Sequence, residues 1–407
     1  MTMLKRYQIV VVGGGIVGAT TALGLAQQGL DVALLDSRQP ARQWPEDSSD
    51  LRVSALTQAS MNILKALGVW SSMEQNAVCA YRDMRVWDGS ADGELHYDST
   101  ETDFTELGYI VENRVTVAAL WTAIEALVSA TILCPARVKS MSLQDDCQRL
   151  QLDDGQEIEA ELVIAADGNN SALRTMSGID VTGWSYQQMG LVATVTTANS
   201  HQMTAWQRFL EQGPLAFLPL HNGKCSIVWT LSTETAQQYQ SLDDQAFLEV
   251  LEQASAGILG AMLEVGPRAA FPLRLQYANR YTEERLALVG DAAHTMHPLA
   301  GQGANAGLLD AAAIIELLVN NRNANRPLAS RKLLRHYERW RKGDNLMLLG
   351  SMDVLKRVYG VNNRSFAVLR SAGMNKINQT VWLKNYFNRY AMGLRADLPA
   401  LARIPLA

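Results

Sequence analysis

Cysteine is scarce in this sequence, and the few that occur follow no pattern. No two cysteines stand at the spacing of a zinc or redox motif, and no histidine lies at zinc-ligand spacing from them. The four are Cys79, Cys134, Cys147 and Cys225. We therefore expect neither a disulfide framework nor a metal site.

Long apolar runs, low-complexity tracts and internal repeats are also missing. No stretch approaches 18 consecutive apolar residues, so a membrane-spanning helix is not expected. An apolar strand follows the N-terminus within a few residues, which leaves no room for a signal peptide. With 48% hydrophobic and 19% charged residues, the 407-residue chain is typical of a globular protein with two lobes and an appendage. We expect a cytoplasmic protein.

Acidic residues are rare in the last part of the chain. From Arg331 onward there are 15 lysines and arginines against 4 acidic residues, although the whole chain has a net charge of −5. This basic region fits attraction to an anionic membrane surface or an acidic partner, and it equally fits a set of solvated helical faces. No nucleic-acid recognition motif accompanies the charge, so nucleic acid is not an expected partner.

Glycines are concentrated at the end of the first apolar run. Gly13, Gly15 and Gly18 have G-x-G-x-x-G spacing between a predicted strand and a predicted helix. The first permits a tight turn, the second lets the backbone approach a pyrophosphate, and the third lets the helix pack on the strand. A second strand ends at Asp36, where a ribose hydroxyl needs an acceptor. The pattern predicts a dinucleotide site.

Two further apolar strands end in a pair of one glycine and one acid. The first ends in Asp167-Gly168, and the second ends in Gly290-Asp291 before a loop with Gly301 and Gly303. Because the carboxyl ends of neighbouring parallel strands line one crevice, both pairs are expected beside the first glycine loop. Between them, residues 182–280 alternate as in an antiparallel sheet, one face of which covers a ligand.

Together these stretches resemble the aromatic-hydroxylase group of flavoprotein monooxygenases, which have the para-hydroxybenzoate hydroxylase fold. The motifs that carry the resemblance are Gly13-x-Gly15-x-x-Gly18, Asp167-Gly168-x-x-Ser171-x-x-Arg174, and Gly290-Asp291-Ala-Ala-His294 with Pro298 and Gly301-Gln-Gly303. The resemblance implies an α/β fold with a three-layer Rossmann-like FAD-binding domain, an inserted antiparallel-sheet substrate domain and a C-terminal helical region. The expected divisions are 1–80, 101–181 and 281–330 for the FAD-binding domain, 81–100 for a substrate-domain hairpin, 182–280 for the substrate sheet, and 331–407 for the basic helical region.

The run from Gly290 to Gly303 is similar to the ubiquinone-biosynthesis hydroxylases in particular. Within that family the likeness is greatest to members that hydroxylate C5 of a 2-polyprenylphenol, on the segments Val86-Trp-Asp, Cys225-Ser-Ile-Val-Trp and His336-Tyr-Glu-Arg. The resemblance implies an FAD-dependent monooxygenase that uses O₂ and transiently bound NAD(P)H and acts through a C4a-hydroperoxyflavin. It also implies assembly with other ubiquinone-biosynthesis proteins or with further copies of the chain. Attack at C1 or C6 stays open, as does a flavin-bearing structural subunit of a membrane-associated complex.

The resemblance also assigns roles to individual residues. Asp36 and Asp291 are assigned to the adenosine ribose and the ribityl chain, and the loop at 301–305 to the isoalloxazine edge. The implied cofactor residues are Gly13, Gly15, Gly18, Asp36, Arg52, Arg114, Asp167, Gly168, Gly290, Asp291, Gly301, Gly303, Ala304 and Asn305. The implied catalytic residues are Arg52, His297 and Pro298, and the implied substrate contacts are Phe217 and Pro219. No base for a phenol is identified.

Aromatic residues recur near the C-terminus at four-residue spacing. Trp382, Tyr386 and Tyr390 fall on one face of a predicted helix, and Lys384 and Arg389 add positive charge. Such a face docks on anionic headgroups, or it packs on the protein's own core or a second subunit. We expect peripheral association with the inner face of the membrane or with a complex.

Overall fold

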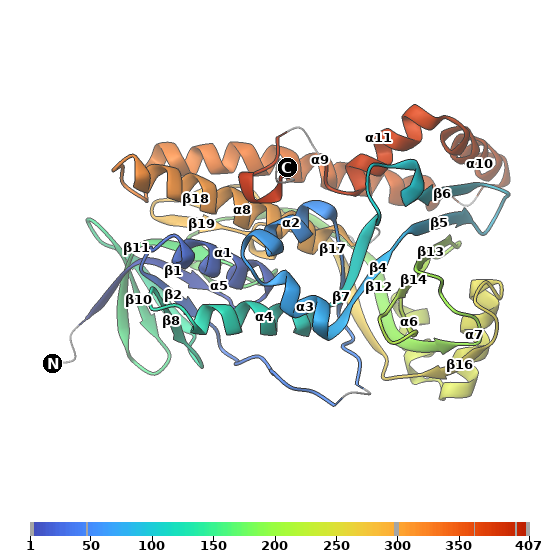
Figure 1. Cartoon of the computed structure of the whole chain (residues 1–407), viewed down its shortest axis with the longest axis horizontal. Helices are drawn as coiled ribbons and strands as arrows, with labels where there is room; N and C mark the ends of the chain where they lie inside the picture. Colours follow the sequence, from blue (N-terminus) through green and yellow to red (C-terminus); the bar gives the residue numbers. More distant parts are fainter. Residues whose placement is uncertain (1–3, 46–47, 297–300, 362, 395–396, 404–407) are drawn as a thin grey trace.

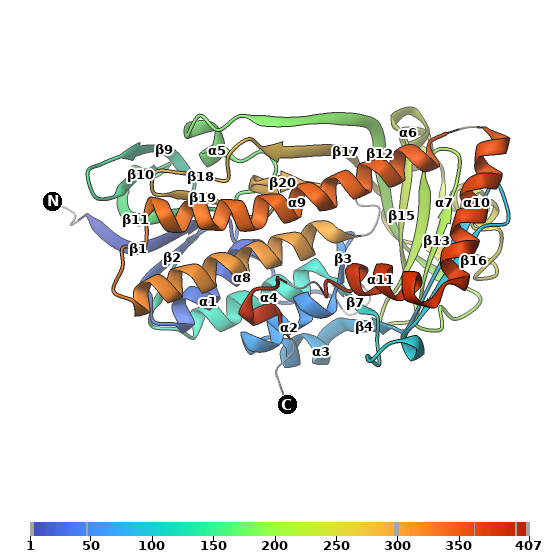
Figure 2. The same ribbon diagram turned by 90° about the horizontal axis from the view of Figure 1, so that it is seen from above.

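The chain folds into two lobes that lie side by side, and C-terminal helices run across both of them (Figure 1; Figure 2). This computed structural model describes residues 4–45, 48–296, 301–361, 363–394 and 397–403.

The first lobe is built on a mostly parallel sheet. Its strands are β1 (Lys5–Val12), β2 (Val32–Leu35), β8 (Ala130–Leu133), β9 (Val138–Leu143), β10 (Gln148–Leu152), β11 (Glu157–Ala165), β18 (Thr282–Glu283) and β19 (Leu286–Leu288). Their order is β18-β19-β11-β1-β2-β8, and β9 and β10 extend from β11. The parallel pairs β1–β2, β1–β11 and β11–β19 bring the carboxyl ends of four strands to one edge. Both predicted acid–glycine pairs therefore lie at the edge that also carries the first glycine loop.

Three helices of the first lobe pack against one another beside this sheet. They are α1 (Ile16–Gln27), α4 (Asn113–Glu125) and α8 (Gln302–Asn323), and α1 contacts the other two. A methyl group on Gly24 would lie 2.5 Å from Cδ1 of Ile315, which shows how closely α1 approaches α8. By length and composition α8 could cross a membrane, but 67% of its most apolar window is buried inside the molecule.

The second lobe is a larger, mostly antiparallel sheet. Its strands are β5 (Asp83–Asp88), β6 (Glu94–Asp98), β12 (Val181–Thr197), β13 (Thr204–Phe209), β14 (Pro214–Pro219), β15 (Cys225–Ser232), β16 (Met262–Val265), β17 (Ala269–Ala278) and β20 (His294–Thr295). Their order is β20-β17-β12-β15-β14-β13-β5-β6, and β16 pairs with β12. The hairpin expected within residues 81–100 is confirmed as β5–β6, and it joins this sheet through a parallel pair with β13. Two helices, α6 (Thr233–Ser241) and α7 (Asp244–Ser255), cover one face of it.

Several shorter elements lie between the lobes and around the first sheet. A three-stranded sheet has the order β3-β7-β4. The bounds are β3 (Val53–Leu56), β4 (Val78–Tyr81), β7 (Gly108–Glu112), α2 (Gln58–Ala66), α3 (Trp70–Ala77), α5 (Ala172–Met176), and the 3₁₀ turns η1 (Ser99–Glu101), η2 (Gly290–Ala292) and η4 (Ala400–Ala402). The residue limits expected for the domains stay predictions.

The basic C-terminal region forms α9 (Arg331–Tyr359), α10 (Arg364–Gln379) and α11 (Val381–Ala391). Helix α9 is fixed to the first lobe, where the hydroxyl of Tyr337 donates to the carbonyl of Leu288 at 2.8 Å. Helix α10 is fixed to the second lobe, where the guanidinium of Arg370 lies 2.6 Å from the buried carboxylate of Asp88. These helices are therefore an integral layer of the fold and not a loose appendage.

Candidate active site

The first glycine loop leaves open space at the N-terminus of α1. A methyl group on Gly18 would lie 1.8 Å from the carbonyl oxygen of Gly13, so this position must stay bare for the helix to pack. A methyl group on Gly15, in contrast, would meet no described atom within 4 Å. Among the described residues no side chain caps α1. The free N–H groups and the helix dipole at this end are suited to a phosphate.

Two side chains hold the Gly14 peptide from both sides. A carboxylate oxygen of Asp36 accepts a hydrogen bond from the Gly14 N–H at 2.6 Å, and the indole N–H of Trp121 donates to the Gly14 carbonyl at 2.7 Å. The other oxygen of Asp36 accepts from the N–H of Arg38. Because each carboxylate oxygen has two acceptor sites, Asp36 can still accept a ribose hydroxyl. Sequence reasoning missed Trp121, which comes from α4.

The three glycine motifs converge on one crevice. A methyl group on Gly13 would lie 2.3 Å from the carbonyl oxygen of Ala166, next to Asp167. Gly290 lies against Val17 of α1, since a methyl group there would come within 3.1 Å of that side chain. The motifs are far apart in sequence, but the parallel strands that precede them bring them together.

Asp167 offers an unused acceptor at this crevice. One of its carboxylate oxygens accepts from the N–H of Leu173, and the other is buried without a hydrogen-bond partner in the described part of the chain. The guanidinium of Arg174 donates to the carbonyls of Asn169 and Ala292, each at 2.8 Å, and so ties this motif to η2. A buried acceptor without a partner costs about 1–3 kcal/mol, which is relieved when a bound group donates to it.

Asp291 directly follows Gly290 in the turn η2 at this crevice. The side chain is accessible to solvent, but the protein around it displaces water, and this desolvation raises the pKa of Asp291. The nearby side chains of His294 and Arg52 act in the opposite direction. Arg52 is itself exposed, at the start of β3. An accessible carboxylate flanked by an arginine can accept hydrogen bonds from polyol hydroxyls.

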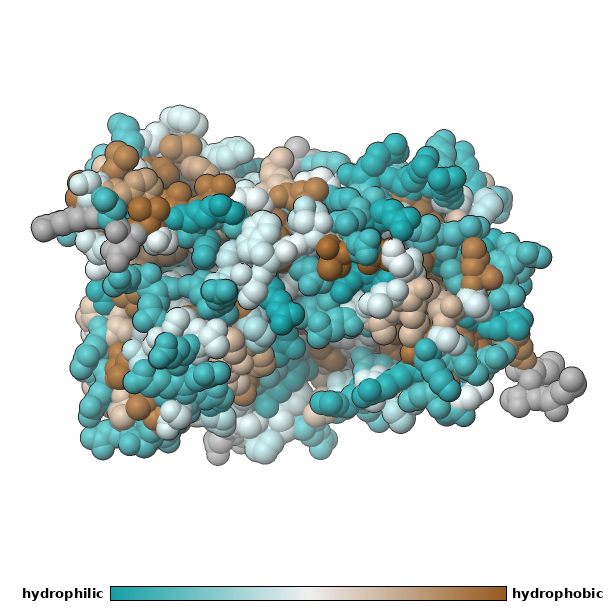
Figure 3. All heavy atoms as spheres, turned by 180° about the vertical axis from the view of Figure 1, so that it is seen from behind, coloured by the Kyte–Doolittle hydropathy of each residue, from teal (hydrophilic) through white to brown (hydrophobic). Residues whose placement is uncertain are grey.

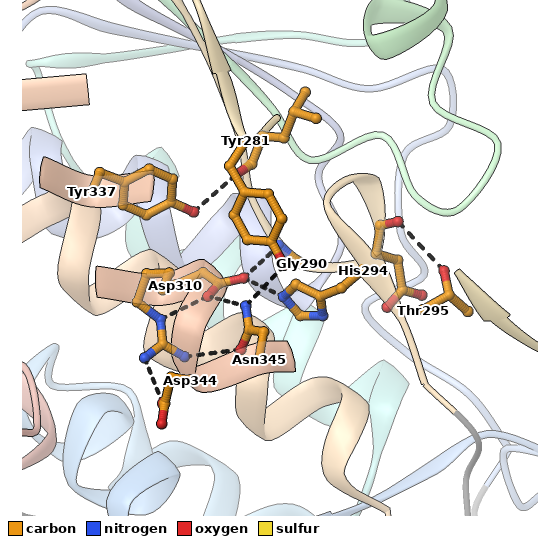
Figure 4. A network of polar contacts seen from close by, with 11 residues as sticks. Tyr281, Gly290, His294, Thr295, Asp310, Tyr337, Asp344 and Asn345 are labelled. Carbon is orange, nitrogen blue, oxygen red and sulfur yellow. Dashed lines mark hydrogen bonds and ion pairs between the residues drawn. The ribbon is translucent and has the colours of Figure 1, made fainter. Parts of the chain in front are cut away.

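A buried polar network supports the Asp291 turn from behind (Figure 4). Asp310 of α8 accepts from the Gly290 N–H at 3.1 Å, lies 2.5 Å from Nε2 of His294, and pairs with Arg341 of α9 at 2.8 Å. Asn345 donates to the same carboxylate. Burial acts to raise the pKa of Asp310, but His294 and Arg341 outweigh it and lower that pKa to about 2. His294 is fully buried, so it holds the turn and does not reach a substrate here.

The N-terminus of α8 is a second uncapped helix start. Gly301 has a φ of +60°, which favours glycine, and no described side chain caps this end. The space around Gly303 is open. The Asn305 side chain is fully used by the protein: it accepts from the Thr57 N–H and donates to the Ala55 carbonyl. A cofactor at this helix start would therefore meet backbone N–H groups and the partly exposed Ala304.

Arg114 has an anchoring position. Its guanidinium pairs with Glu112 at 2.6 Å, donates to the hydroxyl and the carbonyl of Ser48, and lies over the ring of Trp44. These contacts tie Trp44 and Ser48, which lie between β2 and β3, to the start of α4. A direct contact between Arg114 and a flavin stays a prediction.

The implied substrate residues are buried on the second sheet. Phe217 is 1% exposed and packs in the core under α7, and Pro219 on the same strand is also buried. Cross-strand pairing places Ala216 opposite Val228, on the other face of this sheet, where both are partly exposed. That open face is the more accessible apolar surface, and substrate contact by Phe217 stays a prediction. His297 and Pro298 lie outside the described residues.

Some supporting residues escaped sequence reasoning, although a signal existed. Asp310 stands alone in the apolar run from Gly307 to Ile315, where a charge is costly unless it is paired. Its partner Arg341 lies 31 positions away on α9.

Two surface hollows of about 400 and 550 Å³ lie around α7 and β16, and none of the residues of the three glycine motifs lines them.

Comparison with known proteins agrees with this geometry. A sequence profile of the family described as "FAD binding domain" matches residues 6–343. The chain is 37% identical to the 3-demethoxyubiquinol 3-hydroxylase of Escherichia coli over 387 residues, which cover 95% of this chain and 98% of that protein. It is also 37% identical to the ubiquinone hydroxylase UbiL of Rhodospirillum rubrum, over 99% of this chain and 94% of that protein.

The fold is similar to that of solved structures as well. The crystal structure of p-nitrophenol 4-monooxygenase PnpA from Pseudomonas putida matches with a TM-score of 0.79 and 17% identity, covering 97% of this chain and all of that one. At this identity the match supports the fold alone.

Proposed function

The chain belongs to the family described as "FAD binding domain" and is an FAD-dependent monooxygenase of the ubiquinone-biosynthesis hydroxylase group, and on that premise we propose that it hydroxylates the ring of a polyprenylated phenol with NAD(P)H and O₂. The observation that carries the proposal is the convergence of three motifs on one crevice. Within the described part of the chain, this crevice has two helix starts without a side-chain cap, open space at Gly15, and a buried acceptor of Asp167 without a partner.

The described residues fit FAD in an extended pose. The N–H groups at the start of α1 would hold the pyrophosphate, Asp36 would accept from the adenosine ribose, and Asp291 would accept from the ribityl hydroxyls. The N–H groups at the start of α8 would face the isoalloxazine edge and would favour negative charge there. Bound FAD supplies the redox and oxygen chemistry. The protein's part is to position the two rings and to exclude water, and the open apolar face of the second sheet with Ala216 and Val228 provides a wall for the phenol.

We assign C5 of a 2-polyprenylphenol as the preferred ring position, as the sequence resemblance favours. A second position has a specific observation behind it, because one relative at 37% identity is named a 3-demethoxyubiquinol 3-hydroxylase. That name points to a quinol ring that already carries several substituents. The two candidates differ in which intermediate accumulates when the enzyme is absent.

A deletion strain tests this assignment directly. Mass spectrometry of its quinone intermediates is expected to show a species that lacks the C5 oxygen, and a demethoxylated quinol would favour the second position. An unchanged quinone pool would contradict the function. Purified protein should also consume NAD(P)H in step with hydroxylated product when given a short-chain phenol. Partner binding without turnover would support a flavin-bearing structural subunit.

The location and partners of the enzyme are part of the proposal. We place it in the cytoplasm, at the inner face of the membrane, together with other ubiquinone-biosynthesis proteins or as a homo-oligomer. The support is chemical: a polyprenyl chain holds the substrate in the bilayer, so the active site must be brought to the lipid.

A further inference from the structure

One helix presents aromatic side chains and an arginine to solvent on its outer face. Trp382 and Tyr386 of α11 are 72% and 62% exposed, and Arg389 on the same face is exposed as well. Lys384 and Asn388 lie on the opposite face and are buried. The outer side of α11 therefore has an amphipathic surface of the type that lies in a membrane interface.

Two expectations about this helix need correction. Lys384 is not available to headgroups, because its ammonium pairs with Glu101 at 2.6 Å and its side chain is almost fully enclosed. Tyr390 does not continue the exposed stripe, since it packs against the core cluster that holds α10 and α11 on the second lobe. The four-residue spacing predicts three aromatic residues on one helical face, but the third of them, Tyr390, is packed against the core.

The charge around this helix has one sign. Residues 354–396 contain eight lysines and arginines and no acidic residue. Some of them are used inside the fold, such as Arg370, whereas Lys376 and Arg389 are exposed. Val354 at the end of α9 and Val368 and Leu369 of α10 are exposed apolar side chains. Figure 3 shows apolar residues gathered at this corner of the molecule, at its upper left. This part of the surface is thus apolar and basic together.

Helix α11 also ends beside the active site. The carbonyl of Ala391, its last residue, accepts a hydrogen bond from the side chain of Gln302, the first residue of α8. Two residues later, Gly393 lies against Thr57, which precedes α2. Whatever contacts the outer face of α11 is therefore close to the helix start that would border the flavin.

We propose that the outer face of α11 rests on an anionic lipid surface through Trp382, Tyr386 and Arg389, and so brings the start of α8 next to the bilayer that holds the prenylated substrate. The need for docking rests on the proposed function. Exposed aromatics with one arginine would also suit a protein partner. Lipid is favoured because the whole segment lacks acidic residues, which an anionic surface would repel.

Vesicle sedimentation with the FAD-loaded enzyme tests the proposal. Vesicles of phosphatidylglycerol and phosphatidylethanolamine are compared with phosphatidylcholine alone, at low and high salt. The wild type should bind the anionic vesicles and release them at high salt. The variants W382A/Y386A and R389E should each bind about tenfold more weakly or worse, since they remove the anchors or reverse a charge next to the headgroups. Matched controls are W184A, a partly exposed tryptophan of β12, and R335E, an exposed arginine of α9.

The following outcomes decide whether the outer face of α11 docks on lipid. Wild-type binding by both test variants would overturn the proposal, as would wild-type protein that ignores anionic vesicles. If light scattering shows a wild-type dimer that R389E dissociates, the face joins copies of the chain and lipid docking is wrong. If W382A/Y386A loses FAD, its fold is disturbed, and the vesicle binding of R389E alone then tests the proposal. Turnover of a short-chain phenol without vesicles tests the proposed function separately, so the failure of one is distinguishable from the failure of the other.

Discussion

Two glycines of the first loop have opposite surroundings, and this difference separates folding from cofactor binding. A side chain at Gly15 would enter open space, whereas one at Gly18 would collide with the Gly13 carbonyl 1.8 Å away. We expect G15V to keep its thermal unfolding midpoint in the absence of FAD and to lose FAD binding. We expect G18A to lose about 1–3 kcal/mol of unfolding free energy.

Flavin absorbance after gel filtration and chemical unfolding of the apoprotein measure the two effects. The pair forms its own control, because both changes add a side chain to the same loop. A folded G15V protein that still retains FAD would contradict the placement of the pyrophosphate.

Asp310 gives the fold an acid-sensitive contact. Its folded pKa of about 2 lies below the unfolded value of roughly 3.9. The ionised carboxylate therefore stabilises the fold fully above pH ~4, and this contribution, on the order of 2 kcal/mol, is lost as the pH falls towards ~2. We expect D310N to be less stable at neutral pH by about 3 kcal/mol, because Arg341 is left buried without its anionic partner. The difference from wild type should narrow in acid.

Urea unfolding across this pH range measures the difference. D344N is the matched control, because Asp344 pairs with the same Arg341 from a more exposed position and should matter less. FAD affinity measured on the same variants reports on the turn, since Asp310 also holds the Gly290 N–H. Equal stability of D310N and wild type at neutral pH would show that the network does not support the turn.

At the scale of elements, the sequence predicted those helices and hairpins that depend on residues close together in the chain. The glycine loop followed by α1 and the hairpin expected within residues 81–100 were both predicted, and each is confirmed. Contacts between distant residues were not readable. Trp121 reaches Gly14 across 107 positions, and no local pattern marks a tryptophan as support for a phosphate loop. For the same reason the sequence predicted Lys384 as an exposed positive charge, although in the fold its ammonium pairs with Glu101.

One buried ion pair contributes to the attachment of α10 to the second lobe, beside hydrogen bonds that Asn375 and Asn378 accept. Arg370 and Asp88 are 6% and 0% exposed at their side chains. We expect R370M to lower the unfolding free energy by about 3 kcal/mol, because Asp88 would stay buried without its partner. Hydrogen exchange should show faster exchange of the α10 amides. The double variant R370M/D88L should recover much of the loss, since it removes both charges.

A surface pair on α9 serves as the control. Arg357 and Asp353 lie one turn apart and Arg357 is largely exposed, so R357M should cost less than about 1 kcal/mol. If R370M behaves like R357M, the buried pair is not what holds α10 in place.

At the scale of the whole molecule, the crevice joins parts of the chain that are hundreds of residues apart. In the proposed assignment, loop 13–18 and Asp36 would hold the ADP half of FAD, and Asp291 with the start of α8 would hold the flavin half. A ligand that spans both ends stabilises the folded chain by mass action, by about 2.7 kcal/mol at a free concentration 100 times its dissociation constant. Fragments of the cofactor separate the contributions of the two ends.

We expect FAD to raise the thermal unfolding midpoint most, ADP to raise it less, and FMN to have the smallest effect at equal concentration. ADP would meet Asp36 and the start of α1, which no described side chain caps. Asp36 and Trp121 hold Gly14 in place there through hydrogen bonds. FMN contains only the half that meets Asp291 and α8, and its terminal phosphate would approach the Asp36 end without the adenosine that anchors there. Differential scanning fluorimetry of the apoprotein measures the order, and G15V should abolish the ADP effect while sparing any response to FMN. A larger shift with FMN than with ADP would mean that the flavin half anchors the cofactor, and that the first glycine loop is mainly structural.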